Sequence, residues 1–225
     1  MESPVKRKKP SMPVIGIGKL NEMALKLLIE YMPEFLTAPA VFDIDRLIND
    51  ILCLPLYESD KIVENIMEFI LLTEMNYPII GSGDKIHERG TIILNIKLRN
   101  DPIETRYTKA HEVAHYLIFN EYKSYNSKVV CCYKDNGVTI GYTEDEEKLE
   151  KEADVLANLI LMPIKTFIPC AKKIMDKYGF NEHKMIGNIR IEEQKKVISE
   201  IAAIYAVPDY SVMLHLSVLD LYAMV

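Results

Sequence analysis

The chain of 225 residues contains no run of eighteen apolar residues, which is about the shortest stretch that crosses a membrane as a helix. A basic cluster, Lys6-Arg7-Lys8-Lys9, lies near the N-terminus, but Gly16, Gly18 and Lys19 interrupt the segment that follows it. No apolar core of a signal peptide is therefore present. We expect residues 1–12 to form a disordered, solvated basic tail, and we expect no contact with a membrane.

A disulfide framework is also absent, because the four cysteines form no Cys-x-x-Cys pair. Free thiols of this kind are typical of a reducing compartment, so we expect a cytoplasmic protein. A basic surplus is missing as well, since the net charge is −6. This balance argues against direct binding of nucleic acid.

The C-terminal part has the proportions of a helix-turn-helix, with predicted helices over 191–206 and 209–222. A helix that reads DNA presents Arg, Lys, Asn or Gln to the bases. Residues 210–216 contain almost none of these. We interpret the second helix as a packing element.

The rest of the chain predicts one α+β domain. Apolar residues at helical spacing over 14–36 predict an amphipathic helix that ends at Pro33, with Leu20, Met23, Ala24, Leu27, Leu28 and Tyr31 on one side. A second helix is predicted to start at Asp43 and a third over 60–72, followed by a strand at 91–96 that pairs antiparallel with an earlier strand. Residues 127–142 predict a strand, a turn and a strand.

The segment His111-Glu112-Val113-Ala114-His115 carries the chemistry. Residues four apart lie on the same face of a helix, so His111 and His115 can place two imidazole nitrogens on one metal ion. Glu112 lies about 100° further round the helix, beside a metal-bound water whose proton it can accept. Two imidazoles, a carboxylate and an open position make a catalytic zinc site. Asp101 is the predicted N-cap of this helix, with Pro102 in the first turn and Glu104 at the position of a capping-box acid.

The third ligand is predicted on a second helix that starts at Thr143 and stops at Pro163. Glu150, Ala153, Asp154 and Ala157 share one face of it, and the two alanines allow close packing on the histidine helix. Glu150 can then complete the site, and Asp154 can hydrogen-bond a ligating histidine. Glu152 is the rival ligand, but it points about 160° away from Glu150.

These segments resemble the ImmA/IrrE-type metallopeptidases over most of the chain. Residues 106–115 (RYTKAHEVAH) are similar to the family signature R-[FY]-T-x-A-H-E-x-x-H, and residues 150–163 (EKEADVLANLILMP) to E-x-x-A-[ND]-x-F-A-x-x-L-L-M-P. Residues 201–208 resemble the family's late helix and turn. Leu156 and Ile160 depart from the second signature, which affects packing and not chemistry.

The resemblance implies a zincin-like metallopeptidase domain with a small antiparallel sheet and mainly helical N- and C-terminal parts. We expect a single domain over residues 13–225, with N-terminal helices at 13–75, a catalytic core at 76–165 and C-terminal helices at 166–225. It also implies that His111, His115 and the glutamate of the second signature bind zinc and that Glu112 is the catalytic base.

Several members of the family cleave a neighbouring helix-turn-helix repressor, and members are typical of bacteria and their mobile elements. The resemblance therefore implies a zinc-dependent endopeptidase whose substrate is a protein, with a repressor of a phage or mobile element favoured. The alternative is a zinc-binding regulator that sequesters a repressor or antitoxin without cutting it. Four residues are candidates to stabilise the oxyanion: Tyr107, Tyr133, Tyr142 and His183.

Overall fold

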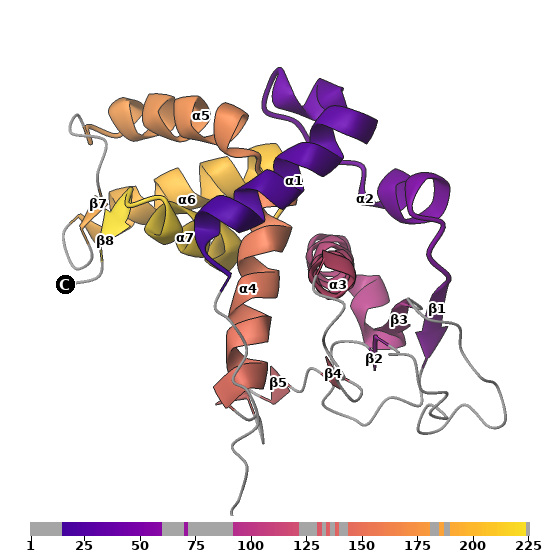
Figure 1. Cartoon of the computed structure of the whole chain (residues 1–225). Coiled ribbons are helices and arrows are strands. Elements are labelled where there is room, and N and C mark those ends of the chain that lie inside the picture. Colours follow the sequence, from indigo (N-terminus) through magenta and orange to yellow (C-terminus); the bar gives the residue numbers. More distant parts are fainter. Residues whose placement is uncertain are drawn as a thin grey trace, which may run out of the picture.

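The structure is a computed structural model of the whole chain, drawn in Figure 1. It describes residues 15–59, 70–71, 92–121, 130–131, 134–135, 138–139, 144–180, 185–186 and 190–223. Helices dominate these residues, as expected. The tail at 1–12, most of the helix expected over 60–72, the cap at Thr143 and three of the four oxyanion candidates (Tyr133, Tyr142 and His183) lie outside the described residues.

Helix α4 (Glu144–Leu161) is the element on which the others converge (Figure 1). It packs against α3 (Pro102–Glu121), α1 (Ile17–Tyr31) and α7 (Asp209–Val218). Its second half is buried all round, as a helix surrounded by other helices must be, with at most 1% exposure at Leu156, Ala157, Asn158, Leu159, Ile160 and Leu161. The two departures from the family signature, Leu156 and Ile160, thus lie in the core.

The N-terminal helices follow the predicted pattern. Helix α1 buries Leu20, Ala24, Leu27 and Leu28, whereas Tyr31, expected on the same side, is 43% exposed. A 3₁₀ turn, η1 (Pro33–Leu36), follows it. The short helix α2 (Ile44–Arg46) begins where Asp43 Oδ1 accepts the N–H of Arg46 at 2.9 Å, which confirms the predicted N-cap, and it continues as a π-helical turn, η2 (Leu47–Ile51).

The strands differ from the predicted sheet. β1 (Leu56–Ser59) pairs with β3 (Ile92–Asn95) in parallel, with Leu56 opposite Ile92, so the antiparallel pairing expected for this segment is wrong. The long connection between the two strands allows a parallel arrangement, and strand periodicity contains no information about direction. A 3₁₀ turn, η3 (Ile96–Asn100), leads from β3 into α3.

The other described strands are two residues long and form three further pairs. β2 (Ile70–Leu71), at the end of the segment expected to be helical, pairs antiparallel with β4 (Val130–Cys131). β5 (Lys134–Asp135) and β6 (Val138–Thr139) pair antiparallel, which confirms the hairpin expected there. β7 (Met185–Ile186) and β8 (Tyr222–Ala223) pair in parallel. A single antiparallel sheet is therefore not confirmed by the described residues.

Three helices complete the C-terminal part. Helix α5 (Ile164–Lys177) is followed by Tyr178 and then by Gly179, whose φ of +80° is the left-handed conformation favoured by glycine after the end of a helix. Helix α6 (Ile191–Tyr205) joins α7 at a bend of 103°. Val212, His215 and Leu216 of α7 are buried against the other helices, in agreement with its interpretation as a packing element.

Among the described residues, no single helix has both the length and the apolar composition of a membrane span. Two bent pairs, one made of most of α4 with α5 and one of α6 with α7, reach these values only when each pair is taken together.

Candidate metal centre

Helix α3 is fixed at its start by the predicted cap. Asp101 Oδ1 accepts the N–H of Glu104 at 3.0 Å, and Pro102 occupies the first helical position. The Glu104 carboxylate does not close a capping box, because the Asp101 N–H donates to Leu98 O and Glu104 accepts the hydroxyl of Tyr210 at 2.8 Å. The start of the helix is therefore tied to α7.

One turn of α3 brings the two histidines together. His111 and His115 are 1% and 2% exposed, and their Nε2 atoms lie 3.0 Å apart. Their rings meet edge to face, with centroids 4.6 Å apart. The i, i+4 spacing thus points both nitrogens at the same place.

Helix α4 adds a carboxylate at this place. Glu150 Oε2 lies 3.2 Å from His111 Nε2, and Glu150 Oε1 lies 3.4 Å from His115 Nε2. Ala153 and Ala157 are fully buried on α4, in the close packing with α3 that their small size was expected to allow. Among the described residues, the three side chains form a group able to hold a metal ion.

Glu152, the rival ligand, does not lie beside the histidines. Its Oε1 accepts the N–H of Ile15 at 2.6 Å, just before α1. The side chain is buried there, and burial raises its pKa. The structure therefore brings Glu150, and not Glu152, to the histidines.

Asp154 lies one turn beyond Glu150 and orients the first histidine. Its Oδ1 accepts from His111 Nδ1 at 2.9 Å and from the hydroxyl of Tyr107 at 3.0 Å. An Nδ1–H that donates to a carboxylate leaves the lone pair on Nε2, which is the tautomer that binds metal. Asp154 is thus hydrogen-bonded to a candidate ligating histidine, as expected from the sequence.

The part of Tyr107 was not recognised from the sequence. Tyr107 was a candidate for oxyanion binding, but its hydroxyl donates to Asp154 and its ring is 1% exposed. Its position one turn before His111 predicts the same face of the helix, but the acid on α4 that it contacts depends on how the two helices pack.

Glu112, the predicted base, follows His111 on α3 and is 0% exposed. A carboxylate is costly to bury without a chemical or structural reason. The histidines stabilise the ionised form of the Glu150 carboxylate. Burial raises its pKa, but the attraction of His115 and hydrogen bonds with both histidines outweigh burial and place the pKa well below its ordinary range.

The donor set fits a divalent metal ion. Tetrahedral ligands at about 2.0–2.1 Å from a zinc ion lie roughly 3.3 Å from one another. Here the two imidazole nitrogens lie 3.0 Å apart, one Glu150 oxygen lies 3.2 Å from His111 Nε2, and the other Glu150 oxygen lies 3.4 Å from His115 Nε2; all four atoms carry lone pairs. Two histidines and one carboxylate are also the ligand number of a catalytic site, which keeps one position open.

Comparison with known protein families agrees with this geometry. The model of the M78 peptidase family, described as the IrrE N-terminal-like domain, matches residues 75–203, which is more than half of the chain. The chain belongs to this family. Its resemblance to ImmA/IrrE-type metallopeptidases is thereby confirmed, and M78 peptidases are metal-dependent. No curated protein matches the chain.

The matched segment runs from before β3 to the last turn of α6 and includes every residue of the candidate centre. Helix α1 lies outside it, although Glu152 of the matched segment binds the backbone just before α1. The backbone that leads into α1 is thus bound by a residue of the matched segment.

Proposed function

We propose that this M78 peptidase is a zinc-dependent endopeptidase that cleaves a specific protein substrate, with a helix-turn-helix repressor of a phage or mobile element as the favoured substrate. The observation that carries the proposal is the pair of His111 Nε2 and His115 Nε2, 3.0 Å apart on the helix that also buries Glu112, with the two carboxylate oxygens of Glu150 on α4 lying 3.2 and 3.4 Å from them. Family membership supports peptide hydrolysis.

In this proposal each residue has a separate task. His111, His115 and Glu150 hold the ion, and Asp154 fixes the His111 ring through Nδ1. A bound zinc ion would supply a Lewis acid that polarises the scissile carbonyl and acidifies a water molecule. Glu112 accepts the proton of the attacking water on a carboxylate oxygen and delivers it to the nitrogen of the leaving amine.

The burial of the site supports this division. Glu112 and the two histidines are at most 2% exposed, so the charge of Glu112 acts in a medium of lower dielectric constant than water. A base in such a site interacts strongly with a nearby cation and with the proton it transfers.

The test is incubation of the purified, metal-loaded protein with the product of an adjacent repressor-like gene, read by intact-mass spectrometry. Wild type runs beside Glu112→Gln and beside Glu147→Gln, a matched control at an exposed position of α4. Discrete fragments from wild type and Glu147→Gln, but not from Glu112→Gln or after chelation, are expected.

Two outcomes count against the proposal. Fragments from Glu112→Gln at the wild-type rate would remove the base from the mechanism. A stable complex without fragments, formed equally by all three proteins, would favour the alternative in which a repressor or antitoxin is sequestered without cleavage.

A further inference from the structure

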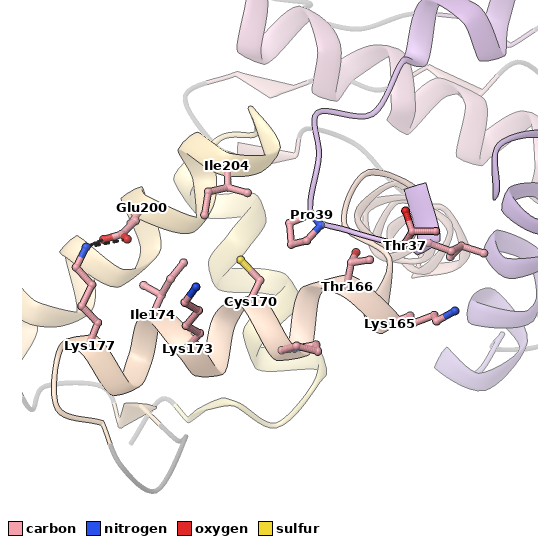
Figure 2. A pocket seen from close by; sticks show the side chains of 12 residues that line it. Thr37, Pro39, Lys165, Thr166, Cys170, Lys173, Ile174, Lys177, Glu200 and Ile204 are labelled. Atoms are coloured by element: carbon pink, nitrogen blue, oxygen red, sulfur yellow. Dashed lines mark hydrogen bonds and ion pairs between the residues drawn. The ribbon is translucent and has the colours of Figure 1, made fainter. Parts of the chain in front are cut away.

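A groove of about 770 Å³ lies between α5, α6 and the segment that follows η1 (Figure 2). None of its lining residues belongs to α3 or α4, which carry the metal centre. The volume is within the range of about 300–1,000 Å³ that is usual for small-molecule sites. The groove therefore has room for a ligand that is neither the metal nor the peptide substrate.

The interior of the groove is apolar. Ile174 and Leu36 are buried in its lining, and Ile204 approaches from α6. Cys170 points into the groove in Figure 2, and burial raises the pKa of its thiol, which stays neutral. A neutral thiol behaves as a small apolar group, so these side chains suit a hydrocarbon.

Three lysines line the groove, and two of them, Lys165 and Lys173, give it a positive charge. Lys177 is neutralised, because its Nζ lies 2.7 and 2.9 Å from the carboxylate oxygens of Glu200. Lys173 extends from α5 beside Ile174 (Figure 2), and neither it nor Lys165 forms an ion pair with any residue that the structure describes. An ammonium without a carboxylate partner, beside an apolar surface, suits an anionic head group.

We propose that this groove binds a small amphipathic carboxylate, with the carboxylate at Lys173 and the hydrocarbon chain along Cys170 and Ile204. Lys165 and Lys173 are eight residues apart on α5, which corresponds to about 12 Å along the helix. A chain of about ten carbons is comparable in length. The site is independent of the proposed peptidase activity.

The experiment is isothermal titration of the full-length, metal-loaded protein with decanoate below its micellar concentration. Decyltrimethylammonium, with the same chain and the opposite charge, is titrated in parallel. Lys173→Glu reverses the charge at the proposed head-group position. Lys172→Glu is the matched control, since Lys172 is also exposed on α5 but does not line the groove.

We expect saturable binding of one decanoate per chain, weakened at least about tenfold in Lys173→Glu and by less than about twofold in Lys172→Glu, with weaker binding of decyltrimethylammonium. Circular dichroism verifies that both variants are folded. Absence of saturable binding to wild type would overturn the proposal, as would equal affinity of the two variants. Binding that a chelator abolishes and Lys173→Glu leaves unchanged would place decanoate at the metal centre and would also overturn it.

Discussion

Glu150 and Glu152 are only two residues apart on α4, but their side chains contact different parts of the molecule. Glu150 faces the histidines of α3, while Glu152 faces the backbone of Ile15. They point about 160° apart on the helix, so each contacts a different neighbour. The sequence Glu-x-Glu left two candidate ligands, and the packing on each side of α4 places Glu150, not Glu152, beside the histidines.

Glu152→Ala is expected to lower the free energy of unfolding by about 1–2 kcal/mol, because the buried N–H of Ile15 loses its acceptor. Urea denaturation measures this change, with Glu147→Ala as the exposed control on the same helix. The metal content of Glu152→Ala should equal that of wild type. A variant as stable as wild type would show that this tie contributes nothing to stability.

Asp154→Ala is expected to weaken metal binding by about 10–100-fold, because His111 loses the partner that orients its ring. Tyr107→Phe removes only the hydroxyl that donates to Asp154 and keeps the ring in contact with Tyr210, so its loss should be smaller and in the same direction. Competition with a chromophoric chelator measures both affinities. Unchanged affinity in Asp154→Ala would contradict the orienting role.

At the scale of elements, Arg106 ties α3 to two other segments. Its guanidinium donates to Phe42 O at 2.6 and 3.0 Å and to the carbonyls of Tyr205 and Ala206 at 2.7 Å. Burial lowers the pKa of Arg106 to about 10, which still leaves it charged at neutral pH. The arginine of the family's first signature is thus a structural residue that holds the C-terminal end of α6.

Arg106→Lys is expected to lower the free energy of unfolding by about 2–3 kcal/mol, because one ammonium cannot reach carbonyls on both sides of the planar guanidinium. Chemical denaturation measures the change. Arg99→Lys is the control, since Arg99 is exposed and pairs with the carboxylate of Glu58. Equal effects of the two substitutions would contradict the proposed tie.

His215 connects α7 to α4 and makes stability depend on pH. Its Nε2 donates to Met162 O at 2.9 Å, and burial lowers its pKa to about 4, against about 6.5 in the unfolded chain. The unfolded state binds the proton more readily than the folded state does. The contribution of His215 to the free energy of unfolding is therefore fully present above pH 6.5 and is lost as the pH falls toward 4.

Between pH 7 and pH 4, wild type should therefore lose about 3 kcal/mol more of its unfolding free energy than His215→Gln, which keeps a donor for Met162 O and does not titrate. Denaturation curves across this range, with chelator present so that the metal ligands titrate alike, measure the difference. Parallel pH profiles of the two proteins would contradict a buried neutral His215.

Helices and caps could be predicted from the sequence because their signals are local. The period of α1, the cap at Asp43 and the start of α3 at Asp101 depend on residues within one or two turns. The direction of β1 and β3 could not be predicted, since it depends on a pairing between distant segments. For the same reason, the contact of Tyr107 with Asp154 became visible only in the packed structure.

For the whole molecule, the arrangement depends on α4, which lies between α1, α3 and α7. One face of this helix presents Glu150 and Asp154 to α3, and the remaining faces of its second half are core. Substitutions in the core of α4 are therefore expected to disturb the metal centre as well as stability. The sequence predicted the face of α4 that lies against the histidine helix, from the spacing of Glu150, Ala153, Asp154 and Ala157. It did not predict which elements pack on the other faces.

The most direct test of the account is the metal content of purified protein, measured by inductively coupled plasma mass spectrometry after dialysis against zinc. Wild type and Glu152→Ala should each retain about one zinc ion per chain, and Glu150→Ala should retain much less, because two imidazoles alone hold zinc weakly. Full zinc content in Glu150→Ala together with loss in Glu152→Ala would contradict the assignment of His111, His115 and Glu150 as the metal centre.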